Sequence, residues 1–460
     1  MKKILFLILF LFFGLIFNKS ILASSNIFGL HLTQTQDIHS AKDVINSNGG
    51  DWGWVTLVIR TNQLDYRTWQ DFLDNCRKYH IIPIIRLATY SDQGNWKIPN
   101  PSDIDNLANF LNSLNWPIKT QYVSLFNEVN HGQEWGGQVD VNSYVDLSIY
   151  ASTKFKSLNS NFFILNGALD LAAPNSMPKF LSAKSFYEQI YSYKPEFFDS
   201  IDGLASHSYP NHGFVGKPYH TGQHSILGYQ WELETIKKMG VTKDFPVFIT
   251  ETGWPHREGI NQKNNFFTTK TTSQFLLDAY QVWSTDNRIQ AVTPFIFNYP
   301  HPPFDHFSWL DQDEQLYPEY QKVIDAAKST NSPAQITQYQ LYRNQIPFLI
   351  FANHEYSGQI SLKNTGQSIW GETNFCLQPT VSESVDVTQI CTNPSDKIHP
   401  GQIKIFPFKF KIKNNISQNI SLSWEGLPET EINLFSENST IYHPKINLWS
   451  KLKNLFSKKD

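Results

Sequence analysis

The chain has 460 residues, a formal net charge of −3 and 17% charged residues. This length is comfortable for two domains, and a hydrophobic content of 40% supplies enough apolar material for a large core. Such a composition excludes a mainly disordered chain. The near-balanced charge, with no long basic run in the main body, argues against a nucleic-acid partner. Composition does not indicate an oligomeric state.

The first residues have the pattern of an export signal. Lys2 and Lys3 precede an unbroken apolar run, Ile4–Phe17, and Ala23 offers a small residue at a cleavage position. This pattern predicts a signal peptide over residues 1–23 and a secreted or cell-surface protein. An uncleaved N-terminal anchor is the alternative, although a spanning helix needs about 20 apolar residues.

Between residues 26 and 330, apolar runs alternate with segments of helical periodicity. Eight runs have the length of strands: Ile27–Leu32, Trp54–Arg60, Ile81–Leu87, Tyr122–Phe126, Phe162–Leu169, Ile201–Ser206, Val247–Thr250 and Ala291–Phe297. Continuous apolar runs are typical of parallel strands buried on both faces. Eight strand–helix units predict an α/β fold, a (β/α)8 TIM barrel. An open doubly wound sheet is the alternative, but no glycine-rich phosphate loop follows the first strand. Among the helices, Asp103–Leu114 has Ser102 as its expected N-cap.

The pattern changes after residue 330. Residues 331–341 are rich in turn formers and predict a linker. Short apolar runs separated by turns then predict a smaller all-β sandwich domain over residues 342–440. Cys376 and Cys391 lie in this region and could pair in an oxidising compartment, whereas Cys76 lies on the apolar face of a helix and is expected to be buried.

Residues 441–460 form a basic tail. Five lysines alternate there with Trp, Leu and Phe residues at helical spacing. Such a helix can lie on an anionic membrane surface, which makes a membrane a possible partner. A solvated terminal helix that packs on the sandwich is the other interpretation.

Polar residues stand where the predicted barrel strands end, and the carboxyl ends of the strands carry the active site in this fold. Glu128 and Glu251 follow the fourth and seventh strands, so their side chains can approach one another across one mouth. Two carboxyl groups about 5 Å apart, one protonated and one ionised, can cleave a glycosidic bond through a covalent intermediate. Arg60 or Arg86, which end the second and third strands, could keep one carboxylate ionised.

Asn127-Glu128 and Glu251, in eight-strand order over residues 26 to about 310, resemble the signature of the clan A (4/7 superfamily) retaining glycoside hydrolases. The segment Thr250–Pro255 is similar to the nucleophile segment of the β-1,3-glucanase and galactanase branches. Phe126 stands where plant β-1,3-glucanases have glycine, so that family is not assigned. The segment Leu362–Trp370 faintly resembles immunoglobulin-like accessory modules.

The resemblance implies a role for each matching residue. Glu128 would be the acid/base and Glu251 the nucleophile. Asn127 would bond the sugar 2-hydroxyl and Arg60 would bond Glu251. The His-x-Tyr pair His207 and Tyr209 would also contact the substrate, and Tyr209 would orient the nucleophile. The other expected substrate contacts are the loop residue Trp254 and the platform Trp309.

The prediction is therefore a retaining glycoside hydrolase that acts on an oligo- or polysaccharide without a cofactor or metal. A catalytically inactive glycan-binding adhesion protein and a transglycosylase are the alternatives. Arg60 could instead form a salt bridge at the barrel rim, and His207 could be structural. His220 and His224 have the spacing of a metal pair but no supporting carboxylate.

Overall fold

The computed structural model describes residues 25–347, 349–381, 385–413, 420–427, 430–435 and 439–441. The predicted signal peptide lies outside these ranges, and so does the basic tail from residue 442 onward. Among the helices of the described ranges, none is both long enough and apolar enough to cross a membrane.

Eight parallel strands form a closed barrel, which confirms the predicted fold class. The strands are β1 (Gly29–His31), β2 (Gly53–Arg60), β3 (Ile81–Ala88), β6 (Gln121–Ser124), β7 (Phe162–Leu165), β8 (Leu204–His207), β9 (Val247–Glu251) and β10 (Ile289–Val292). They pair in the order β1-β2-β3-β6-β7 and β8-β9-β10. Parallel bridges Leu165↔Gly203 and Phe28↔Val292 join these two groups at both edges and close the barrel.

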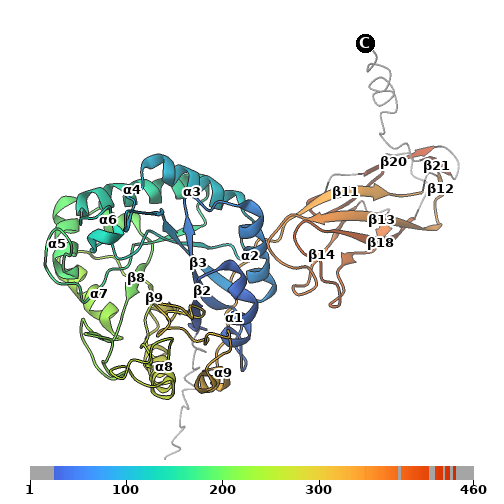
Figure 1. Cartoon of the computed structure of the whole chain (residues 1–460). Helices are drawn as coiled ribbons and strands as arrows, with labels where there is room; N and C mark the ends of the chain where they lie inside the picture. The colour runs from blue at the N-terminus through green and yellow to red at the C-terminus, as the bar shows by residue number, and fades with distance from the viewer. Residues whose placement is uncertain are drawn as a thin grey trace, which may run out of the picture.

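Helices surround the barrel, as Figure 1 shows. They are α1 (Ile38–Ile45), α2 (Tyr66–Lys78), α3 (Pro101–Ser113), α4 (Val141–Leu158), α5 (Ala183–Tyr193), α6 (Phe197–Ser200), α7 (Gly228–Lys238), α8 (Thr269–Trp283) and α9 (Gln321–Asp325). The loops add the short hairpin β4 (Ser91–Asp92) and β5 (Asn95–Trp96) and the 3-10 turns η1 (Thr35–Asp37), η2 (Gly132–Glu134) and η3 (Pro318–Tyr320).

The strands are mostly apolar because both of their faces are covered. Outward side chains pack against the helices in one large core. Inward side chains fill the barrel itself, where Trp54, Tyr122, Phe163 and Phe248 contact one another with ring centroids 5.1–5.8 Å apart. The interior is therefore a packed core, and the open space for chemistry lies at the strand ends.

Helix α3 begins earlier than the sequence indicates. Asn100, rather than Ser102, is the N-cap, and its side chain accepts a hydrogen bond from the backbone N–H of Asp103 at 3.1 Å. The Asp103 side chain accepts from the Asn100 N–H in return, which makes a reciprocal capping box. Pro101 occupies the first helical position, where its missing N–H leaves no bond unmade.

The C-terminal domain is an antiparallel β-sandwich. Its strands are β11 (Tyr339–Gln345), β12 (Leu349–Ile350), β13 (Glu355–Asn364), β14 (Cys376–Leu377), β15 (Pro379–Val381), β16 (Val385–Val387), β17 (Ile390–Cys391), β18 (Ile403–Ile412), β19 (Ile420–Trp424), β20 (Thr430–Phe435) and β21 (Ser439–Ile441). They form one sheet in the order β11-β13-β18-β16 and another in the order β12-β21-β20-β19-β15. Strand β11 begins inside the predicted linker.

Alternation along β18 builds the core of the sandwich. Phe406, Phe408, Phe410 and Ile412 are buried while the intervening residues are exposed. A disulfide between Cys376 and Cys391 joins β14 to β17, the pairing left open by the sequence. Cys76 is buried and free, as predicted.

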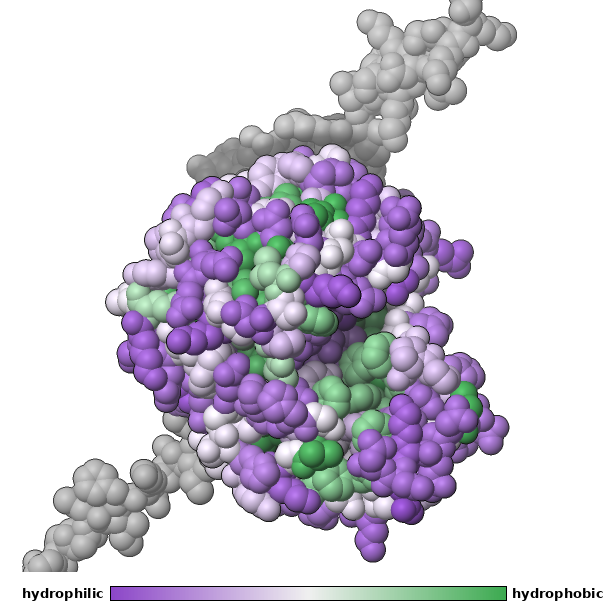
Figure 2. Space-filling model, turned by 60° about the vertical axis from the view of Figure 1, so that its left-hand side comes forward, coloured by the Kyte–Doolittle hydropathy of each residue, from purple (hydrophilic) through white to green (hydrophobic). Residues whose placement is uncertain are grey.

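The sandwich contacts the barrel at the segment between α3 and β6, beside α2 in Figure 1. The Asn115 side chain donates to the Gly366 carbonyl at 3.0 Å, and Gln367 donates to the Ile118 carbonyl at 2.9 Å. The linker adds a bond from Gln335 to the Pro117 carbonyl at 2.8 Å. On the surface shown in Figure 2, polar side chains predominate and smaller apolar groups gather around a hollow.

A chain that ends after Gln335 should still fold as a barrel. The barrel core is separate from the sandwich core, so truncation removes the polar contacts at Asn115 and Ile118 and the contact between His80 and Glu372, but no strand of the barrel. We expect the melting temperature to fall by roughly 2–6 °C, the effect of about two or three lost polar contacts. Thermal unfolding followed by circular dichroism checks this, and loss of all cooperative unfolding would contradict it.

Candidate active site

Glu251 is the last residue of β9 and lies at the carboxyl end of the barrel. Its side chain is about nine-tenths buried and is surrounded by donors. Arg86 donates through Nη1 to Oε1, and the Tyr209 hydroxyl donates to Oε2 at 3.2 Å. His31 Nε2 lies 3.6 Å from Oε1. The structure thus brings the Tyr209 hydroxyl to Glu251, where the resemblance places it.

The surroundings of Glu251 favour its ionised form. Burial raises the pKa of this carboxyl, but attraction to His207 and Arg86 outweighs burial and lowers the pKa to about 2. The His31 ring is uncharged at neutral pH, because burial and the nearby Arg86 charge lower its pKa to about 3. Glu251 is consequently a carboxylate across the neutral range.

Glu128 reaches the same mouth from the loop after β6. Phe126 and Glu128 have φ angles of 72° and 34°, in the left-handed region that side chains with a Cβ rarely adopt. The Glu128 backbone is held there by a bond from its N–H to the Ala168 carbonyl at 2.9 Å. Strained backbone of this kind costs about 1–3 kcal/mol per residue and clusters at functional sites, which points to a role for the side chain it aims.

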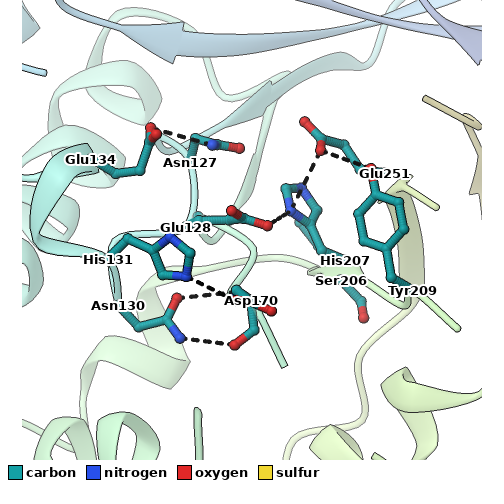
Figure 3. A network of polar contacts seen from close by, with 12 residues as sticks. Asn127, Glu128, Asn130, His131, Glu134, Asp170, Ser206, His207, Tyr209 and Glu251 are labelled. Carbon is teal, nitrogen blue, oxygen red and sulfur yellow. Dashed lines mark hydrogen bonds and ion pairs between the residues drawn. The ribbon is translucent and has the colours of Figure 1, made fainter. Parts of the chain in front are cut away.

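His207 lies between the two carboxylates (Figure 3). Its Nδ1 is 2.8 Å from Oε1 of Glu128 and 3.8 Å from Oε2 of Glu251. Burial lowers the pKa of His207, but the charges of Glu251 and Glu128 outweigh it and raise the pKa above its usual value. The His207 side chain is 1% exposed, so it contacts the two carboxylates and is not open to a sugar. The predicted direct contact between His207 and the substrate is therefore wrong.

The two carboxyl groups are close together. One oxygen of Glu128, one oxygen of Glu251 and one nitrogen of His207 all lie within 4.8 Å of one another. Three such groups could also hold a metal ion, but Arg86 and His207 already supply positive charge to Glu251. The site thus contains two adjacent carboxyl groups of which one is strongly held in its ionised form.

Arg86, and not Arg60, binds Glu251, so the predicted Arg60 contact is wrong. The strand register gives the reason: Arg86 pairs with Val58, whereas Arg60 pairs with Ala88, two residues farther toward the barrel rim. Arg60 is exposed, and its guanidinium lies 5.4 Å from the centre of the Trp96 ring.

Arg86 also orients Asn127. Its Nη1 donates to Oδ1 of Asn127 at 2.7 Å, so the amide nitrogen of Asn127 faces the opposite way. That nitrogen donates to Oε2 of Glu134 at 3.3 Å. Glu134 was not identified from the sequence, because it lies in a loop turn, η2, six residues beyond Glu128.

Two predicted aromatic contacts are wrong. Trp254 is 3% exposed, and its indole N–H donates to the Gly216 carbonyl at 2.7 Å. Trp309 is 1% exposed and stacks on Tyr320 with ring centroids 4.5 Å apart. Both rings are buried against other residues, so neither is free to contact a substrate.

Other aromatic rings lie beside the carboxylates instead. Phe295, three residues beyond the end of β10, is half-buried and lies 5.3 Å from the His31 ring. It contacts Phe304 and Phe307, and Phe307 contacts Phe214. Phe295 lies inside the predicted eighth apolar run, Ala291–Phe297, which extends beyond the end of β10 at Val292, so the sequence alone did not show it as a loop residue.

A second His–carboxylate pair flanks Glu128. Nε2 of His131 lies 2.8 Å from Oδ2 of Asp170, and Asn130 donates to the Asp170 backbone carbonyl at 2.9 Å (Figure 3). Burial lowers the pKa of His131, but Asp170 and Glu128 outweigh burial and raise it. The raised pKa favours the protonated form of His131, whose charge is balanced by the carboxylate of Asp170.

Comparison with known proteins gives distant likenesses. No family model and no curated protein matches the chain. Among solved structures it is similar to a GH39 β-xylosidase from Caulobacter crescentus, at 12% identity over 85% of this chain and 98% of that chain, with a TM-score of 0.46. It is also similar to a glucosidase from Croceicoccus marinus, at 8% identity over 85% and 97%, with a TM-score of 0.47.

A family 51 α-L-arabinofuranosidase from Bifidobacterium longum is similar at 10% identity over 85% of this chain and 97% of that chain, with a TM-score of 0.44. Likenesses this distant do not assign an activity to the chain.

Proposed function

We propose that the protein is a retaining glycoside hydrolase in which Glu128 is the acid/base and Glu251 the nucleophile. The observation that carries this proposal is the carboxyl pair formed by Glu128, from the loop after β6, and Glu251, at the end of β9, with one oxygen of each group within 4.8 Å of the other. Retaining glycosidases have carboxyl groups about 5–5.5 Å apart, whereas inverting ones leave about 6.5–9.5 Å for a water molecule. The shorter separation favours attack by the protein itself.

The geometry supports a double displacement. In the first step an oxygen of Glu251 attacks the anomeric carbon, and Glu128 gives its proton to the departing glycosidic oxygen. In the second step Glu128 accepts a proton from water, whose oxygen attacks the anomeric carbon and releases Glu251. Each step moves one proton through Glu128, and the two steps together return both carboxyl groups to their starting states.

The neighbouring side chains support these roles. Arg86 and Tyr209 hold Glu251 ionised and oriented. His207 contacts both carboxyl groups and so fixes their relative position. Asn127, fixed by Arg86, retains an N–H for a sugar hydroxyl, and the half-buried Phe295 offers an apolar face to a sugar ring.

The natural substrate is proposed to be an extracellular or cell-surface glycan. This location rests on the signal-peptide pattern of residues 1–23, and attachment to a membrane surface rests on the basic tail. The immunoglobulin-like character of the sandwich stays a prediction.

A screen of aryl glycosides and polysaccharides with the mature protein tests the function. We expect cleavage of at least one glycoside class, with the released sugar first formed in the anomeric configuration of the substrate, as followed by proton NMR. Retained glycan binding with no cleavage would instead support an inactive binding protein. Transfer to an added sugar in preference to water would support a transglycosylase.

Substitution of Arg86 tests whether Arg86, as in the structure, or Arg60, as predicted from the sequence, binds Glu251. We expect Arg86→Met to lower kcat by about 10²–10³-fold, the usual effect of removing a charge-stabilising donor. The acid limb of the pH profile should move to higher pH, because the pKa of Glu251 loses one of the charges that lower it. Arg60→Met is the matched control and should stay within a few-fold of the parent; the reverse order of effects would contradict the assignment.

A further inference from the structure

A third carboxyl group, Glu134, lies beside the pair used in the mechanism. Its Oε2 accepts from the amide nitrogen of Asn127 at 3.3 Å (Figure 3). Asn127 in turn accepts from Arg86, which also donates to Glu251. A continuous series of polar contacts therefore connects Glu134 to the proposed nucleophile.

The loop that carries Glu134 is firmly placed. The Gly132 N–H donates to the Lys179 carbonyl at 2.7 Å, and the Gly136 N–H donates to the Trp96 carbonyl at 2.8 Å. Between them, Trp135 is buried, with its ring 5.3 Å from Phe126 and 5.7 Å from Tyr144. Glu134 is consequently held at the site and is not a surface side chain free to turn into solvent.

Several charged groups surround Glu134. Glu128 comes from the loop after β6, Arg86 from β3 and Glu251 from β9, and His131 precedes η2. The β4–β5 hairpin that packs on η2 carries Asp92 and is followed by Lys97, which donates to the Tyr90 hydroxyl. Burial, followed by repulsion from Glu128, raises the pKa of Glu134 to about 7. Its charge therefore changes in the neutral range.

We propose that Glu134 is a positioning residue for the acid/base: its negative charge holds the Asn127 amide and keeps a proton on Glu128. The proposal rests on the hydrolase function and deepens it. An ionised Glu134 is the stronger acceptor for the Asn127 N–H. Its charge also disfavours a second negative charge on Glu128 nearby, because like charges in one site oppose joint ionisation.

The consequence is a site whose activity persists to higher pH than it would without Glu134. Below neutral pH Glu134 is protonated, so its replacement by glutamine should change the activity little. Above neutral pH Glu134 is ionised, and glutamine removes the charge. A residue with a merely structural role would instead affect activity to the same extent at every pH.

Glu134→Gln tests the proposal through the pH profile of kcat/KM on a glycoside with a poor leaving group. We expect nearly parental activity at pH 5 and a loss of about 10-fold at pH 8, with the basic limb shifted downward by about one pH unit. An activated aryl glycoside should lose less, because its leaving group needs little protonation. Glu188→Gln, on the exposed face of α5, is the matched control. An unmoved basic limb, or equal loss at both pH values on both substrates, would overturn the proposal.

Thermal unfolding gives a readout that does not depend on activity. The pKa of Glu134 is raised on folding, so its contribution to stability is fully present below the unfolded pKa and is lost as pH rises through about 7. The melting temperature of Glu134→Gln relative to the parent should therefore increase between pH 5 and pH 8. A flat difference would overturn the proposal. If the difference in melting temperature increases with pH but the protein cleaves no glycoside, only the hydrolase function would be overturned.

Discussion

Replacing Glu251 with alanine should reduce turnover by on the order of 10⁴-fold or more, the usual effect of removing a nucleophile. The carboxylate is about nine-tenths buried, and Arg86, Tyr209 and His207 are arranged around it, so alanine removes the one group that these side chains hold in place for attack. The measurement is kcat on whichever aryl glycoside the parent cleaves.

Azide should restore part of the lost activity. The small anion can occupy the space of the missing carboxylate and attack the anomeric carbon, which gives a glycosyl azide of inverted configuration. Because alanine leaves Arg86 without its partner, circular dichroism must show that the variant is folded, and Glu251→Gln provides a version of nearly equal volume. Parental activity in either folded variant would refute the role of Glu251.

Replacing Glu128 with glutamine should separate substrates by their leaving groups. Glutamine cannot donate the proton that an alkoxide needs, so cleavage of unactivated glycosides should fall by about 10²–10⁴-fold. The first step on a dinitrophenyl glycoside should be nearly unchanged, because that leaving group departs without protonation. Pre-steady-state kinetics should show a burst, since the second step also needs Glu128 as a base.

Equal losses on both substrate types would make Glu128 structural rather than the acid/base. His207 makes the outcome informative, because its contact with Glu128 is 2.8 Å and a glutamine amide can maintain a hydrogen bond there. A large loss on the dinitrophenyl substrate would therefore indicate a disturbed site, and the melting temperature would identify that case.

The barrel was predictable because its strands are buried on both faces. The run Trp54–Arg60 differs from β2 by one residue, and Ile81–Leu87 differs from β3 by one. The last run, Ala291–Phe297, was extended too far because the loop after β10 is itself apolar and largely buried. Strand β11 was missed because Tyr339–Gln345 is mostly polar and exposed, without the alternation of a half-buried strand.

The sequence predicted those site residues whose place in the barrel follows from their position at the end of a strand. Asn127, Glu128, Tyr209 and Glu251 end strands or follow them closely, and the closed barrel brings these ends together. The choice between Arg60 and Arg86 depended on the register of β2 and β3, which no residue pattern reveals. The directions of Trp254 and Trp309 depended on packing with residues distant in the sequence, such as Gly216.

The most direct test of the double displacement is to trap its intermediate on the parent protein. A 2-deoxy-2-fluoro glycoside of the accepted sugar, with an activated leaving group, should form the glycosyl ester quickly and release it slowly. Mass spectrometry of peptic peptides should then find the added fluorosugar mass on Glu251. An adduct on another residue, or inverted product from the normal substrate with no adduct, would contradict the mechanism.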